Sequence, residues 1–426
     1  MNSLLSELLI EIFSLIKSSF GGTSDILSCL LVCRRWRELG VPVLYRHLVL
    51  GTANVELFAA RFNSQYAIHV RSITLRLTQP PLSSYDLSSI IASNAELEKR
   101  LIRLEPLLGS LDMLLSFSLY VPAIVPERCR FKIPARSIIG LIKSLPPSCV
   151  NIEIDSGGYD RNIIAGGEEA HICESLHLLL PRMNHIRIHL SLVCPTLIGT
   201  MATPYNYHLD SYIPTKLPNI RSLLINCSEK SPSAGICLPP KTGHAPFYSH
   251  SMHPWPAMTS ALQKLVDTPG CCPASATIRI HTTTGNDMAG LGVHDTMIIC
   301  DINSHTTRAL PIVKVSPMKK LGWLVRLNDS EGVLTTSRGL IDVAENYSWK
   351  TLIGGARVPA PMAEKESQGI LEVPMIEEVI WRAKNPDVSC ALWDSEALAG
   401  RRLLYADIRK EGVTYTNPVP VAEETS

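Results

Sequence analysis

Apolar and polar positions in the first fifty residues alternate at the spacing of short helices. The apolar residues of the first stretch recur every three or four positions and so share one stripe of a helix. They are Leu5, Leu8, Leu9, Ile12, Phe13 and Ile16. The glycines at 21–22 are expected to end this helix, because glycine is unfavourable in a helix interior. A second helix is predicted over residues 26–31, and a third around residues 33–39, closed by Gly40 and Pro42.

Period-two patterns dominate the middle of the chain. From His185 to Leu190, isoleucine and leucine alternate with polar residues, which predicts a strand with one buried face. The polar members of this strand, His185 and His189 among them, are expected to be exposed. The stretch from Leu217 to Cys227 has the spacing of a leucine-rich repeat strand. Earlier strands are predicted near 73–77 and 150–154.

Helical stretches between the predicted strands give the middle region an alternating order of helix and strand. This order favours an irregular, leucine-rich-repeat-like α/β solenoid. Because the intervals are uneven, a non-repeat α/β domain stays open as the alternative. Prolines then crowd between residues 228 and 273 around a short helix predicted near 257–267, and further strands follow.

These patterns predict a mixed α+β or α/β chain of five parts. A three-helix domain at 1–50 precedes a leucine-rich-repeat-like region at 51–228. A proline-rich loop or linker at 229–275 leads to a smaller α+β section, or a continued repeat, at 276–411. The residues at 412–426 are expected to form a disordered tail.

Composition narrows the classes of partner. The chain of 426 residues carries 40 Lys and Arg against 39 Asp and Glu, so it has no overall field to attract nucleic acid or an anionic membrane. No apolar run reaches the roughly 18 residues of a spanning helix, and Glu7 and Glu11 interrupt what would be the core of an export signal. Its 12 cysteines form no CxxC pair, which favours reduced thiols and a cytoplasmic or nuclear protein.

Candidate reactive residues form no known motif. Cys237, His244, His250 and His253 come closest to a metal set, but their spacing matches no zinc finger. The glycine pairs lack the spacing of a nucleotide-binding loop and are expected to be turns. We therefore expect no metal, no cofactor and no catalysis. An enzyme within the section beyond residue 276 stays open as a weaker alternative.

The order of the N-terminal features resembles the F-box. That pattern runs Leu-Pro-x-Glu-Leu-Leu-x-x-Ile-Phe, then Asp-Leu, then Leu-x-Val-Cys-x-x-Trp. The residues that match its three blocks are Leu4, Glu7, Leu8, Leu9, Ile12 and Phe13, then Asp25 and Leu27, then Leu30, Val32, Cys33, Arg34, Arg35 and Trp36. Leu5 stands where the family has proline, which pre-sets the backbone of a first turn. The sequence up to about residue 230 is similar to uncharacterised fungal F-box proteins.

The resemblance implies a substrate-recognition subunit of a ubiquitin ligase built from a Skp-type adaptor, a cullin and the F-box protein. Its N-terminal helices would bind the adaptor and its downstream region an unknown protein target. The residues implied to build or support the adaptor-facing surface are Leu4, Leu5, Leu8, Ile12, Leu27, Val32, Cys33 and Trp36. Trp36 is either a hot spot of that surface or a core residue. A scaffold that binds the adaptor without a cullin is the alternative function.

Overall fold

The computed structural model divides the chain into two compact units. The first comprises residues 1–186 and 347–372, and the second comprises 187–346 and 373–426. The structure describes residues 5–17, 22–78, 87–121, 133–158, 160–161, 171–201, 212–228, 254–284, 295–315, 322–326, 331–335, 342, 345–346, 348–366, 369–370, 376–377, 397–398 and 400. None of the helices within these ranges is long and apolar enough to cross a membrane. The domain boundaries inferred from the sequence stay predictions.

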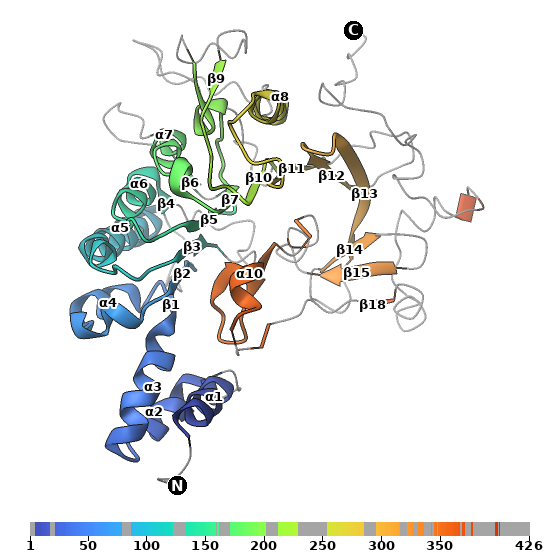
Figure 1. Ribbon diagram of the computed structural model, residues 1–426. Coiled ribbons are helices and arrows are strands. Elements are labelled where there is room, and N and C mark those ends of the chain that lie inside the picture. Colours follow the sequence, from blue (N-terminus) through green and yellow to red (C-terminus); the bar gives the residue numbers. More distant parts are fainter. Residues whose placement is uncertain are drawn as a thin grey trace. The chain divides into compact units, whose positions relative to one another are not determined.

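Three helices open the first unit (Figure 1): α1 (Ser6–Lys17), α2 (Gly22–Leu30) and α3 (Arg34–Arg46). They bury one small apolar core made of Leu9, Phe13, Ile26 and Val43. The ring of Trp36 meets that of Phe13 edge to face, with centroids 5.5 Å apart. The three predicted helices are thus present, and the core that they share accounts for their apolar stripes.

The third helix is longer than the sequence indicates. The prediction that Gly40 and Pro42 close it is wrong, because α3 continues through both to Arg46. Gly40 is buried, and a side chain there would collide with Leu30 at the end of α2. The glycine therefore permits the close approach of two helices, and tertiary packing outweighs its poor helix propensity.

Parallel strands follow, in the order β1-β2-β3-β5 within the first unit. Their bounds are β1 (His47–Gly51), β2 (Ser72–Arg76), β3 (Ser116–Tyr120) and β5 (Asn151–Asp155). The register aligns one apolar row across the sheet, Leu50, Leu75, Leu119 and Ile154, and next to it a row that faces the opposite side, Val49, Thr74, Ser118 and Glu153. Successive side chains of a strand point to opposite faces, so this sheet has an apolar face and a largely polar one.

Helices connect these strands. They are α4 (Val55–Arg61), the 3-10 helix η1 (Ser64–His69), α5 (Leu87–Gly109), α6 (Ala135–Lys143), α7 (Ile172–His177) and the 3-10 helix η2 (Leu180–Arg182). Strands β4 (Ile133–Pro134) and β6 (Asp160–Arg161) form a separate parallel pair. Figure 1 shows α4 to α7 along one side of β1 to β5. The predicted strands near 73–77 and 150–154 are confirmed as β2 and β5, whereas β1 and β3 were not predicted.

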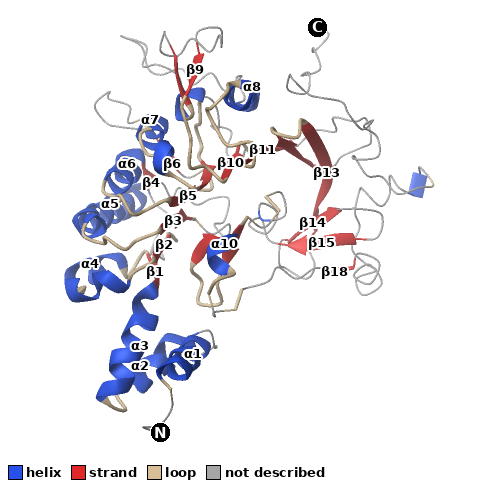
Figure 2. Cartoon of the chain, viewed as in Figure 1, coloured by secondary structure: helices blue, strands red, loops and turns tan. Residues whose placement is uncertain are grey.

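A segment from near the C-terminus returns to the first unit. It forms a hairpin of β16 (Trp349–Thr351) and β17 (Arg357–Pro359), followed by the short helix α10 (Ala360–Ala363). Gly355 has a positive φ of 86° in the turn, as predicted for the glycine pair at 354–355. In Figures 1 and 2 this segment lies on the side of β2 and β3 opposite the helices, and β17 contacts both strands.

The second unit is richer in antiparallel pairing. Its parallel strands β10 (Ser222–Asn226) and β11 (Thr277–Thr284) are followed by the antiparallel series β11-β12-β13-β14-β15-β18. The bounds of the remaining strands of the series are β12 (Asp295–Asp301), β13 (Thr306–Val315), β14 (Gly322–Arg326), β15 (Glu331–Thr335) and β18 (Ile376–Glu377). The unit also holds the 3-10 helix η3 (Pro195–Leu197), the hairpin of β8 (Gly199–Met201) and β9 (Tyr212–Pro214), and α8 (Pro254–Asp267).

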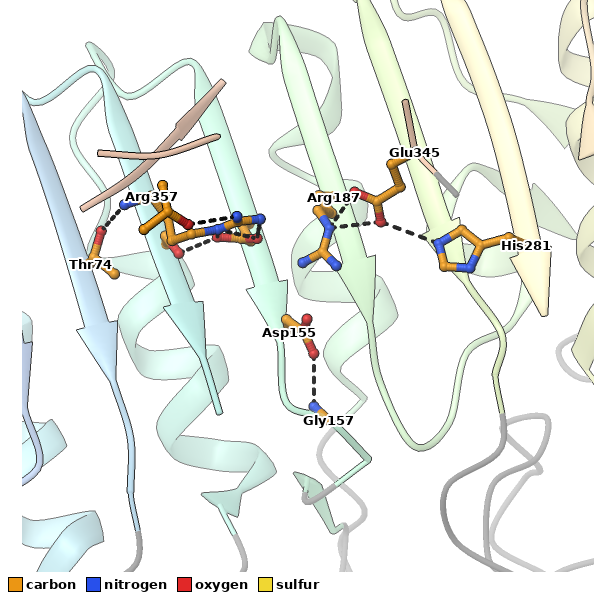
Figure 3. A network of polar contacts seen from close by, with 10 residues as sticks. Thr74, Asp155, Gly157, Arg187, His281, Glu345 and Arg357 are labelled. Atoms are coloured by element: carbon orange, nitrogen blue, oxygen red, sulfur yellow. Dashed lines mark hydrogen bonds and ion pairs between the residues drawn. The ribbon is translucent and has the colours of Figure 1, made fainter. Parts of the chain in front are cut away.

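The boundary between the units falls within β7 (His185–His189), where the sequence misjudges exposure. Ile186 and Ile188 are buried as expected. The expectation that His189 is exposed is wrong, and Arg187 is fully buried as well. In the second unit Arg187 Nε lies 2.7 and 2.6 Å from the two carboxylate oxygens of Glu345, and His281 Nε2 lies 3.2 Å from one of them (Figure 3). The carboxylate of Glu345, from a distant part of the chain, therefore allows Arg187 and His281 to be buried.

Candidate functional site

The first helix exposes more apolar surface than its core requires. Leu9 and Phe13 face the core, whereas Leu5, Leu8, Ile12 and Leu15 are exposed, Leu5 to 66 %. These four follow one another at steps of three, four and three residues, so they share a stripe beside the buried one. Ile10 is also exposed, but it lies two positions from Leu8 and from Ile12 and so on another side of the helix. An exposed apolar stripe on a helix is typical of a protein docking surface.

The end of the second helix carries further exposed apolar side chains. Leu27 of α2 is exposed, although its neighbour Ile26 is fully buried. Leu31 and Val32, in the turn before α3, are exposed to 87 % and 61 %. The amides of both turn residues donate to carbonyls of α2, those of Ser28 and Cys29 at 3.2 Å. The turn is thereby held by its own backbone bonds and presents its side chains outward.

The predicted site residues fall into three groups. Leu5, Leu8, Ile12, Leu27 and Val32 are exposed. Cys33 and Trp36 are partly buried, Cys33 as the residue that precedes α3 and Trp36 against the core of the three helices. Leu4 lies outside the described residues. The assignment of all eight to an adaptor-facing surface stays a prediction.

Leu5, at the family's proline position, also has a backbone role. Its carbonyl accepts a hydrogen bond from the Leu9 amide at 3.2 Å, so Leu5 is the residue that immediately precedes α1 and accepts the first hydrogen bond of the helix. Its side chain remains exposed. The first turn therefore forms with leucine at this position.

Besides Ile10, on another side of α1, sequence reasoning missed two exposed residues next to the predicted surface. Leu15 continues the exposed stripe of α1, and Leu31 is more exposed than any predicted site residue that the structure describes. Both were visible in the sequence as apolar positions. The signal that could have identified them is the width of the apolar stripe, which exceeds what one helix contact buries.

The basic cluster beside Trp36 is mainly a solvated helix face. Arg34 and Arg37 are exposed, and Arg34 pairs with Glu38 one turn later at 2.7 Å. Arg35 is partly buried and donates to the hydroxyl of Ser6 at 3.4 Å, which connects α3 with α1. The exposed pair contributes little stability, because water and salt screen it.

A buried lysine closes the three-helix domain at its C-terminal end. Lys17 Nζ donates to the carbonyls of Val43, Leu44 and His47, at 2.7, 2.9 and 3.3 Å. These carbonyls belong to the last turn of α3 and to the start of β1, so the lysine from α1 satisfies a helix end that would otherwise lack donors. Burial lowers the pKa of Lys17 to about 8, against the opposing charge of Glu366.

The candidate metal residues Cys237, His244, His250 and His253 lie outside the described residues, as do the glycines at 166–167, 290 and 292. Within the described part, Gly157 and Gly158 occupy a turn after β5 with positive φ values of 60° and 80°. Their amides donate to the side chains of Asp155 and Ser156, at 3.0 and 3.1 Å. The glycine pair is thus a turn, as predicted.

Comparison with known proteins identifies the N-terminal domain. The family model described as F-box-like matches residues 3–51, which span α1 to α3 and β1. The search of the curated proteins found no match. The chain therefore carries an F-box-like domain that contains every exposed apolar residue described above.

Replacing Trp36 should destabilise the three-helix core. We expect Trp36→Ala to lower the free energy of unfolding by about 3 kcal/mol, because the ring packs on Phe13 and the substitution leaves a cavity. Denaturant unfolding followed by far-UV circular dichroism measures this. Trp36→Phe keeps an aromatic contact with Phe13 and should lower the free energy of unfolding less than half as much. Equal stability of the native chain and the two variants would contradict a core role for Trp36.

The buried lysine predicts a pH dependence of stability. Because the pKa of Lys17 is lower in the folded chain than its usual 10.5, the unfolded chain binds more protons between about pH 8 and pH 10.5. The native chain should therefore gain stability relative to Lys17→Met as the pH rises through that window. Urea unfolding of both chains across the window tests this, with the exposed Lys99→Met as control. A constant difference would contradict it.

Proposed function

We propose that the F-box-like domain docks on a Skp-type adaptor protein. The observation that carries this proposal is the exposed apolar stripe of α1, together with Leu27, Leu31 and Val32, within residues 3–51. Burying an apolar side chain of this size on a partner contributes about 1.5–3 kcal/mol. A few such side chains at the centre of an interface suffice for specific binding.

The body of the chain would then capture a protein target, so that the protein acts as a substrate receptor of a cullin-based ubiquitin ligase. The support is its architecture, in which parallel strands alternate with helices as in leucine-rich repeat proteins. Such a receptor performs no chemistry itself. It raises the effective concentration of the target near the ubiquitin-carrying enzyme.

A cytoplasmic or nuclear setting is part of the proposal. Cys29, Cys33 and Cys149 are free thiols, and burial raises the pKa of Cys149 to about 12, which keeps it protonated and unreactive. Reduced cysteines are typical of these compartments.

Charge placed on the exposed stripe should abolish adaptor binding. We expect Leu8→Glu combined with Ile12→Glu to reduce the adaptor retained in a pull-down at least tenfold, because both charges would be buried in the interface without partners. The matched control is Ile102→Glu on α5, since Ile102 is 50 % exposed and Leu8 45 %. Equal retention by the double variant and the control would contradict the proposal.

Recruitment of a cullin separates the receptor from a scaffold. The receptor function predicts that the intact chain retains both the adaptor and a cullin when purified from cells with neddylation preserved. The Leu8→Glu and Ile12→Glu chain should lose both together. Retention of the adaptor with no cullin would support the scaffold alternative instead.

A further inference from the structure

The segment of residues 348–366, here called the brace, lies on the polar face of the parallel sheet. Its two strands pair only with each other, so no backbone ladder joins them to β2 or β3. Side chains must therefore hold the brace in place. Two clusters of charged residues do so, one over the strands and one beside the F-box-like domain.

The first anchor is a fully buried ion pair. Arg357 Nη2 lies 2.9 Å from a carboxylate oxygen of Glu153 on β5, and its Nε lies 3.3 Å from both oxygens (Figure 3). The Ser118 hydroxyl donates to the same carboxylate. The Arg357 amide donates to the Thr74 hydroxyl at 2.8 Å. One residue of the brace thus connects three neighbouring strands.

The second anchor is Glu366, which contacts the last residue of α3 and the first residue of β1. A carboxylate oxygen of Glu366 lies 2.9 Å from Arg46 Nε and 3.1 Å from His47 Nε2. His47 Nδ1 in turn lies 2.7 Å from the Ser72 hydroxyl on β2. Burial raises the pKa of Glu366, but His47 and Arg46 outweigh this and hold it below its usual value. The carboxylate is therefore charged at neutral pH and binds the residues where the helical domain joins the sheet.

Apolar packing lies between the two anchors. Leu352, Ala356, Val358 and Ala363 form a buried cluster of the brace. Val49 of β1, within the F-box-like domain, packs against it. The brace therefore contacts the domain through both charge and apolar surface.

We propose that residues 348–366 are a brace that fixes the orientation of helices α1 to α3 of the F-box-like domain relative to the parallel sheet, to which β1 belongs, with Glu366 as its positioning residue. Besides Glu366, the three helices are joined to the rest of the first unit by the continuous chain from α3 into β1, which pairs with β2, and by the Lys17 bond to the His47 carbonyl. Tyr45 of α3 also stacks on Tyr66 of η1, with ring centroids 4.6 Å apart. The use of a fixed orientation rests on the proposed function, since a bound target must lie at a defined place relative to the adaptor.

Neutralising the second anchor tests the brace. The Glu366→Gln chain keeps the shape of the side chain and loses its charge, and the matched control is Glu364→Gln, an exposed carboxylate two residues earlier. Spin labels introduced at Glu38 and Ile102, both exposed, by chemistry that does not use cysteine report the distance between the domain and α5. We expect the distance distribution to widen at least twofold in Glu366→Gln and to stay unchanged in Glu364→Gln.

Hydrogen exchange provides the second measurement. The amides of Leu48 to Gly51 should exchange about tenfold faster in Glu366→Gln than in the native chain or the control. Arg46→Gln removes only the more exposed partner of Glu366, so it should give a smaller change in the exchange rates of the same amides. This variant replaces Glu366→Gln in both measurements if Glu366→Gln fails to fold. Unchanged distance distributions in both variants would overturn the proposal, whatever the exchange rates.

These measurements distinguish a failure of the brace proposal from a failure of the adaptor proposal. Neither measurement requires the adaptor, so a widened distribution supports the brace even if no chain binds it. If the adaptor binds the native chain, it should bind Glu366→Gln equally well, because Glu366 lies outside the exposed apolar stripe. Loss of the adaptor with Glu366→Gln alone would show that the anchor shapes the docking surface itself, and would overturn a role limited to orientation.

Discussion

A buried charge on the parallel strands of the first unit, which those strands cannot neutralise among themselves, is the constraint on which the unit's structure depends. Glu153 occupies the centre of β5 and is fully buried, where an unpaired carboxylate would cost several kcal/mol. Its counter-charge is Arg357, which is 204 positions away in the sequence. The parallel sheet is therefore complete only when a segment from near the C-terminus has folded onto it.

The same segment explains why the sheet has two unlike faces that are both buried. One face holds leucines, isoleucines and a phenylalanine, as strands covered by helices normally do. The other carries Thr74, Ser118 and Glu153, side chains suited to a wet surface, yet all three are fully buried. Target capture by the proposed receptor would therefore need a surface other than this part of the sheet.

Reasoning from the sequence located local features, but it failed where contacts with residues far away in the sequence determine the structure. The helices and strands with clear periodicity were predicted, and the F-box-like resemblance agrees with the family model at residues 3–51. The end of α3 was predicted wrongly because Gly40 packs closely against Leu30, and helix propensity gives no information on such a contact. His189 and Arg187 were misjudged because alternation shows which face a residue takes, but not whether that face is covered. The counter-charge Glu345 could not be found from spacing, since it is 158 positions from Arg187.

Because the chain is synthesised from its N-terminus, the two sides of the second anchor are made at different times. Arg46 and Glu366 are 320 residues apart, and a ribosome adding about 5–20 residues per second needs roughly 16–64 s to make the chain between them. During that interval the nascent F-box-like domain has no Glu366 to meet, and a product truncated before residue 357 would lack both anchors permanently. Completion of this domain's attachment to the sheet therefore reports that translation has passed residue 366.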